Sequence, residues 1–80
     1  MMEPIRIRMS TIEDVKHFVT EANAQVSDID VVSGRYLVDA KSLLGLFSLD
    51  LTKPVDVVVH GTPGDREKFV QAIERLVVKD

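Results

Sequence analysis

The sequence predicts an α+β fold in which four antiparallel strands and three helices follow the order βαββαβα, with the helices on one face of the sheet. Two observations predict it. In four short segments, apolar residues recur with the two-residue period of strands. In three other segments the apolar spacing is three or four residues, which is typical of amphipathic helices. Because each helix has one apolar side to bury, two packed layers accommodate all of them.

The N-terminal elements are a strand followed by a helix. In residues 5–9 (IRIRM), apolar residues alternate with arginines, as in a strand with one solvated face. From residue 12 the apolar spacing becomes 3, 4, 3 and 4, so one apolar stripe runs along a helix. The members of this stripe are Ile12, Val15, Val19, Ala22 and Val26.

The start of this helix offers two alternative capping boxes. Ser10 stands three residues before Glu13, and Thr11 stands three residues before Asp14. Each pair combines a hydroxyl N-cap with an acid at the third helical position, and the sequence leaves both open. Both acids also suit the positive end of the helix dipole.

The middle of the chain predicts a hairpin and a short helix. Residues 28–33 (DIDVVS) and 36–38 (YLV) are predicted strands, joined by a tight turn at residues 34–35 (GR). Residues 42–49 (SLLGLFSL) are a predicted helix with Ser42 as its N-cap. Three leucines spaced three apart can face the core: Leu43, Leu46 and Leu49.

The C-terminal part predicts a fourth strand and a last helix. Pro54 breaks the chain before residues 55–59 (VDVVV), which are rich in β-branched residues. Residues 61–64 (GTPG) are a predicted turn, and residues 65–78 a predicted helix. Its expected inner face consists of Phe69, Ala72, Ile73, Leu76 and Val77.

Composition narrows the class of protein. The 80 residues suffice for a single domain, residues 1–80, with 45% apolar and 29% charged residues. The net charge of −3, without a basic cluster, argues against direct binding of nucleic acid. No apolar run reaches membrane-spanning length and no signal core precedes the first strand, so a cytoplasmic protein without membrane contact is expected. The absence of cysteine excludes disulfides and thiolate metal sites.

Few residues suggest catalysis. His17 and His60 lie far apart in sequence without metal-ligand spacing, so neither a metal nor another cofactor is expected. Asp28, Asp30 and Asp39 can approach one another across the hairpin, where solvated strand faces explain them better than acid–base chemistry. These residues favour a binding or regulatory module over an enzyme.

A signature in the middle of the chain is similar to one known family. Ala40, Lys41, Ser42, Leu43, Gly45, Ser48 and Leu49 match the pattern AKS-[LI]-x-G-x-x-SL. With this pattern the sequence resembles HPr, the phosphocarrier of the bacterial sugar phosphotransferase system, from about residue 5 to residue 78. The resemblance implies one HPr-like domain, an open-faced β-sandwich, and a protein that passes on phosphate without being an enzyme itself.

The phosphate-carrying histidine of that family has no counterpart here. HPr carries it at the start of the first helix, followed by an arginine and a proline. An alignment anchored on residues 18–19 (FV) places Thr11 at the histidine position, Glu13 at the arginine position and Asp14 at the proline position. A threonine without an adjacent base is a poor nucleophile, and Glu13 would repel a phosphate. A phosphocarrier that uses His17 or Thr11 as its acceptor remains the alternative.

The resemblance assigns a second site to Ser42. In Gram-positive members of the family a kinase phosphorylates the serine at this position, and the product acts with a catabolite repressor. Leu43, Leu44 and Phe47 resemble the apolar docking patch beside that serine. The expected partners are an HPr kinase, a transcriptional regulator or a phosphotransferase-system enzyme. Ser42 is also a good N-cap, so a scaffold-only interaction domain remains open, as does the oligomeric state.

Overall fold

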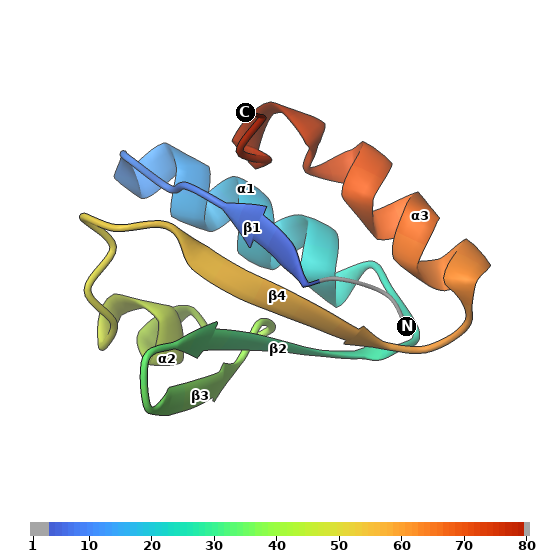
Figure 1. The fold of residues 1–80 in the computed structure, drawn as a ribbon, viewed down its shortest axis with the longest axis horizontal. Coiled ribbons are helices and arrows are strands. Elements are labelled where there is room, and N and C mark those ends of the chain that lie inside the picture. The colour runs from blue at the N-terminus through green and yellow to red at the C-terminus, as the bar shows by residue number, and fades with distance from the viewer. Residues whose placement is uncertain (1–3, 80) are drawn as a thin grey trace.

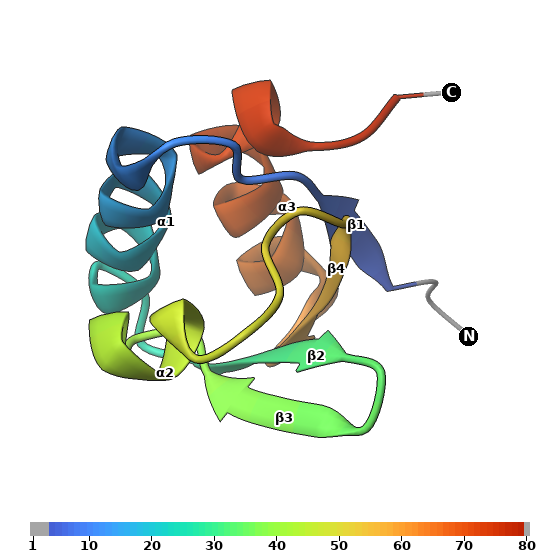
Figure 2. The same ribbon diagram turned by 90° about the vertical axis from the view of Figure 1, so that its left-hand side faces the viewer.

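One antiparallel sheet carries three helices on one of its faces (Figures 1 and 2). The computed structural model describes residues 4–79. Its elements are β1 (Ile5–Ile7), α1 (Ile12–Asn23), β2 (Asp28–Ser33), β3 (Tyr36–Asp39), α2 (Leu43–Phe47), β4 (Val55–His60), α3 (Pro63–Ala72) and the 3₁₀ turn η1 (Glu74–Leu76). This order and layering confirm the predicted fold class.

The strands stand in the order β1-β4-β2-β3, with every neighbouring pair antiparallel. Val31 of β2 pairs with Val57 of β4 and with Val38 of β3. Because alternate side chains point to opposite faces, this register directs Ile29, Val31, Val55 and Val57 toward the helices. All four are buried. No helix of residues 4–79 lies on the opposite face of the sheet (Figure 2).

The buried side of α1 differs from the predicted stripe. Val15, Phe18 and Ala22 are buried, whereas Ile12 is 60% exposed and Val26 is 94% exposed. The helix ends at Asn23, so Val26 lies in the connection to β2. At 100° per residue, Phe18 stands close to the centre of the inner face and Ile12 at its margin. The prediction was therefore wrong for Ile12 and Val26, and it omitted Phe18.

The last helix begins and ends earlier than predicted. Thr62 is its N-cap and forms a capping box with Asp65, while Pro63 takes the first helical position, where no N–H is needed. The predicted turn at residues 61–64 is therefore partly helical. After Ala72 the chain tightens into η1, and Leu76 remains buried as predicted.

Beyond η1 the chain runs along the outer edge of β1. The N–H of Arg8 donates to the carbonyl oxygen of Leu76, and the N–H of Val78 donates to that of Arg6, both at 2.9 Å. Val77 forms an antiparallel bridge with Ile7. The predicted helix over residues 65–78 was wrong here, because the Leu76 carbonyl and the Val78 N–H bond to the edge of β1 instead of to a further helical turn.

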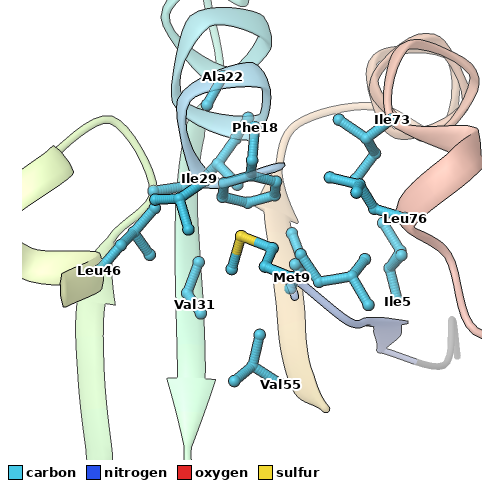
Figure 3. Close-up of a cluster of buried hydrophobic side chains, with 14 of the residues drawn as sticks. Ile5, Met9, Phe18, Ala22, Ile29, Val31, Leu46, Val55, Ile73 and Leu76 are labelled. Carbon is cyan, nitrogen blue, oxygen red and sulfur yellow. The ribbon is translucent and has the colours of Figure 1, made fainter. Parts of the chain in front are cut away.

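The core lies between the sheet and the helices (Figure 3). Phe18 of α1 and Phe69 of α3 meet edge to face, with ring centroids 5.5 Å apart and planes inclined by 66°. The other buried apolar residues are Ile5, Ile7, Met9, Val15, Ala22, Ile29, Val31, Ala40, Leu46, Leu49, Val55, Val57, Ile73 and Leu76. Side chains from every helix and strand except β3 thus form one cluster.

The β2–β3 hairpin turns where the sequence predicts it. Ser33 pairs with Tyr36, which leaves Gly34 and Arg35 as a two-residue loop. Gly34 has φ +58°, the only positive φ among residues 4–79. A positive φ at the first loop position alone is the pattern of a type II′ turn, which matches the twist of the two strands.

Candidate functional site

Ser42 is the N-cap of α2, as predicted. Its Oγ accepts the N–H of Gly45 at 3.1 Å, and its own N–H donates to the carbonyl oxygen of Asp39 at 3.0 Å. At the other end of α2, the hydroxyl of Ser48 donates to the carbonyl oxygen of Gly45 at 2.6 Å. The helix covers only Leu43–Phe47 of the predicted residues 42–49, because these two serine contacts close both of its ends.

The side chains of α2 divide between core and solvent. Leu46 is fully buried and Leu49, just past the helix, is also buried, in agreement with the leucine spacing. The prediction that Leu43 can face the core was wrong, since 37% of its surface is exposed. Leu44 is 82% exposed and Phe47 46% exposed. Leu43, Leu44 and Phe47 form the α2 patch, an apolar surface directly beside Ser42.

The first turn of α1 uses one of the two predicted capping boxes. Thr11 Oγ1 accepts the N–H of Asp14 at 3.1 Å, and Asp14 Oδ2 accepts the N–H of Thr11 at 3.3 Å. The same oxygen accepts the N–H of Ser10 at 2.9 Å. These donors, with the Ser10 N–H contributing most, lower the pKa of Asp14 from its ordinary value. Glu13 is exposed beside this turn.

A groove of about 410 Å³ connects the first turn of α1 with the α2 patch. Thr11, Ile12 and Val15 line it on the α1 side, and Phe47 and Leu51 line it opposite. The exposure of Ile12 thus extends the apolar surface of α2 across to α1. The sequence pattern missed this role, because Ile12 fits the apolar stripe by spacing.

His17 lies away from the first turn of α1. Its Nε2 is 3.2 Å from the carbonyl oxygen of Ala72, near the end of α3. The side chain is half-buried and joins two helices, a partner that no sequence pattern indicated. The contact of His17 with Ala72 gives this histidine a structural role, because it links α1 to the last turn of α3.

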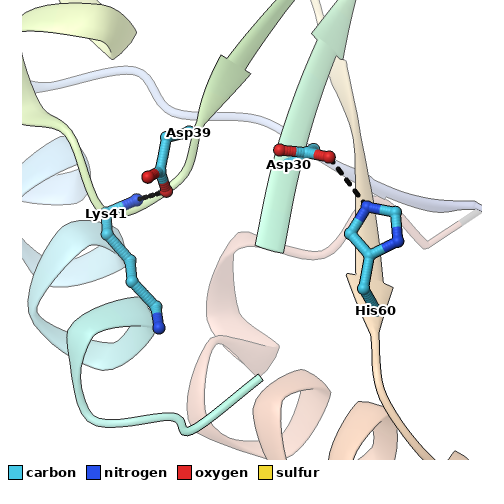
Figure 4. Close-up of polar contacts among 4 residues, drawn as sticks. All are labelled: Asp30, Asp39, Lys41 and His60. Carbon is cyan, nitrogen blue, oxygen red and sulfur yellow. Dashed lines mark hydrogen bonds and ion pairs between the residues drawn. The ribbon is translucent and has the colours of Figure 1, made fainter. Parts of the chain in front are cut away.

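Two of the three hairpin aspartates, Asp30 and Asp39, lie on neighbouring strands, and each contacts a different partner (Figure 4). Asp30 of β2 and Asp39 of β3 are directly opposite each other. Asp30 Oδ2 lies 2.7 Å from Nε2 of His60, and Asp39 Oδ1 accepts the N–H of Lys41 at 2.9 Å. Within residues 4–79 no group of three acidic or histidine side chains has the geometry of a metal site.

Comparisons with known proteins agree on one family. The sequence model described as the PTS HPr component phosphorylation site matches residues 14–79. Thr11 and Glu13 lie outside that match. No curated protein sequence matches the chain. None of the helices in the described part of the chain is long and apolar enough to span a membrane.

Three solved structures share the fold. HPr-C-His from Thermoanaerobacter tengcongensis has a TM-score of 0.72 at 24% identity, over 91% of this chain and 92% of its own. The phosphocarrier protein HPr from Bacillus anthracis has a TM-score of 0.70 at 25% identity, over 95% and 96%. Crh, the catabolite repression protein of Bacillus subtilis, has a TM-score of 0.65 at 24% identity, over 99% and 94%. The Crh structure is described as a dimer with a swapped domain.

Proposed function

The chain belongs to the HPr family, and from this premise we propose that it is a cytoplasmic regulatory member of the family. In this role residues 1–80 form one HPr-like domain that binds protein partners through the α2 patch. Ser42 is the residue that a kinase modifies, and phosphate is not relayed through a histidine. The partners we propose are an HPr kinase, a transcriptional regulator or a phosphotransferase-system enzyme.

The observation that carries this proposal is the position of the Asp14 carboxylate. In the resemblance described above, the phosphoryl group of HPr is held by the start of the first helix. Here Asp14 Oδ2 already accepts the N–H groups of Ser10 and Thr11, which are donors that an anion at this helix end would need. A phosphate placed there would meet a carboxylate of like charge.

The alternative acceptors have little support. Thr11 Oγ1 accepts the N–H of Asp14, and the carboxylate beside it, that of Asp14, has a lowered pKa and is therefore a weak base. His17 lies between one and two turns along α1 from Thr11 and contacts the backbone of Ala72. This leaves the surface around Ser42 as the part of the molecule that best fits a signalling role.

Ser42 and the α2 patch support the regulatory part of the proposal together. Leu44 is an apolar side chain that is 82% exposed, and Phe47 extends the same surface toward the α1 groove. Contiguous exposed apolar side chains are typical of protein interaction sites. A phosphate on Ser42 would add about two negative charges at the margin of this surface, which changes the partners that it can bind.

A kinase assay tests the switch. The protein is incubated with an HPr kinase and ATP, and its intact mass is measured. We expect one added phosphate on the wild type and none on Ser42→Ala. Ser48→Ala is the matched control, since Ser48 lies at the other end of α2 and also bonds to Gly45; it should still be modified. An unmodified wild-type protein would contradict the proposal.

A second experiment tests the α2 patch as the docking surface. Leu44→Lys should raise the KM of the kinase for this protein, because it places a charge in the proposed contact. Val26→Lys is the control, since Val26 is equally apolar and 94% exposed but lies outside the patch. If both variants behave alike, the docking surface is elsewhere.

The missing relay needs its own assay. Incubation with phosphoenolpyruvate and the first enzyme of the phosphotransferase system should leave the protein unmodified. An acid-labile phosphate that disappears in His17→Gln would establish His17 as the acceptor and overturn this part of the proposal. A stable phosphate lost in Thr11→Ala would do the same for Thr11.

A further inference from the structure

β3 leaves one edge of the sheet open. It is the outermost strand after β2, and no described element of the chain lies beyond it (Figure 2). The other outermost strand, β1, is already covered by the backbone of residues 76–78. The unpaired N–H and C=O groups of an edge strand are a template for another strand. The open edge of β3 therefore marks a place for strand pairing.

The hydrogen-bond alternation identifies the open backbone groups. The N–H of Ala40 donates to the carbonyl oxygen of Ile29, and Ser33 pairs with Tyr36 at the hairpin turn. In an antiparallel ladder the residues between such pairs point their N–H and C=O the other way. Leu37 and Asp39 thus direct their backbone groups to the open edge, where the Asp39 carbonyl also accepts the N–H of Ser42.

The side chains of β3 are unusually apolar for an exposed edge. Tyr36 is 71% exposed and Leu37 is 63% exposed. The strand contains no lysine and no proline, residues that commonly prevent edge pairing. Its charged residues are Asp39 at one end and Arg35 in the adjoining turn. They have opposite signs and stand at equal distances in sequence from Leu37.

We propose that two copies of the protein associate through antiparallel pairing of their β3 strands, with the two-fold axis at Leu37. In this register the two Leu37 residues face each other and exchange both backbone hydrogen bonds. Tyr36 then stands opposite Val38 of the second copy, a favourable pair of an aromatic and a β-branched side chain. Arg35 stands opposite Asp39 of the second copy, and symmetry makes this ion pair twice.

Charge selects this register over its neighbour. With the axis at Val38, the backbone groups can also pair, but each Leu37 would face Asp39 of the other copy and Arg35 would lose its partner. A cross-strand pair of opposite charges stabilises the register centred on Leu37. The register centred on Val38 lacks this stabilisation, because Asp39 there faces an apolar residue. Asp39 retains an oxygen for the contact, since only its Oδ1 accepts the N–H of Lys41.

Pairing of two four-residue strands buries a small interface, so the fraction of dimer is expected to depend on the protein concentration. Sedimentation equilibrium up to about 1 mM protein would measure its dissociation constant. Arg35→Glu should raise this constant by about tenfold or more, because both symmetric pairs turn repulsive. Asp39→Lys should act likewise, and Lys53→Glu, a charge reversal in an exposed loop, should not.

Mixing the two weakened variants gives the sharpest test. In a mixed pair, Glu replaces Arg35 in one copy and Lys replaces Asp39 in the other, so both cross-strand contacts are again between opposite charges. The mixture should therefore dimerise where neither variant does alone. Asp39→Asn controls for the lost contact with Lys41, since an amide oxygen can still accept that N–H.

Two outcomes would overturn the inference. One is a wild-type protein that stays monomeric over the whole concentration range. The other is a dimer whose stability is the same in Arg35→Glu and in the mixture, which would point to an exchange of segments or to another surface. Hydrogen exchange adds an independent readout, because the Leu37 amide should become protected as the concentration rises.

Discussion

The carboxylate of Asp14 accepts the N–H of Ser10 at 2.9 Å, so the first turn of α1 contains its own anion. The same carboxylate reaches the N–H of Thr11, and the Thr11 hydroxyl accepts the N–H of Asp14 in return. An orphan helix end that would otherwise attract an external anion is thereby satisfied from within the chain. The stability of this helix start and the proposed loss of phosphate relay therefore depend on the same two residues, Thr11 and Asp14.

Acid should weaken the protein through Asp14. Hydrogen bonds from the Ser10 and Thr11 backbones lower its folded-state pKa below the ordinary 3.8, so its ionised form stabilises the native state. That stability is present above pH 3.8 and is lost as the pH falls through the lower folded-state pKa. Urea midpoints measured from about pH 6 to pH 2 should decline less in Asp14→Asn than in the wild type.

The Thr11 cap should be visible in stability. Thr11→Ala removes the hydroxyl that accepts the Asp14 N–H and is expected to lower the free energy of unfolding by roughly 0.5–2 kcal/mol. Thr20→Ala changes the same residue type at an exposed position inside α1 and should not destabilise. Urea denaturation of both variants measures the difference. Equal losses would mean that the cap contributes nothing specific.

The edge-to-face pair of Phe18 and Phe69 should be central to stability. Both rings are fully buried, so Phe18→Ala removes the aromatic contact and leaves a cavity between α1 and α3. We expect a loss of about 3–5 kcal/mol in the free energy of unfolding. Val26→Ala, at a position that the spacing also assigned to the core, should change it by no more than about 0.5 kcal/mol. A small effect of Phe18→Ala would show that the core closes around the gap.

Two glycines should respond in opposite directions to alanine. Gly34 has φ +58°, where a Cβ is strained, so Gly34→Ala should destabilise by about 1–2 kcal/mol. Gly64 lies in the first turn of α3 with space around it, and Gly64→Ala should stabilise by roughly 0.5–1 kcal/mol. Thermal unfolding of the two variants checks the signs. The same sign for both would contradict the turn geometry.

Sequence patterns were sufficient to locate most strands and the starts of the first two helices. β2 and β4 appear where the alternation of apolar residues predicts them, because one face of each is buried by the helices, and β3 appears where the predicted hairpin turn places it. The N-caps Thr11 and Ser42 were also recognisable, since hydroxyl side chains at helix starts serve a local need. Helix caps and apolar alternation depend on residues close together in the sequence, so sequence patterns can predict them.

Features that depend on distant contacts were not predictable. The contact of His60 with Asp30 requires the register between β2 and β4, and that of His17 with Ala72 requires the packing of α3 on α1. The end of α3 shows the same limit. Residues 77–78 continue the helical spacing, but the edge of β1, from the other end of the chain, bonds to the Leu76 carbonyl and the Val78 N–H instead.

The path of the C-terminal segment along β1 also limits growth of the sheet. An open-ended stack of strands needs two free borders, one for each neighbour. In the described part of the chain one border is already filled by the protein's own residues, which leaves β3 as the remaining point of addition. Two molecules joined there use the β3 edge of both copies, which leaves no β3 edge for a third. Association by this route therefore ends at a closed pair and does not continue into a fibre.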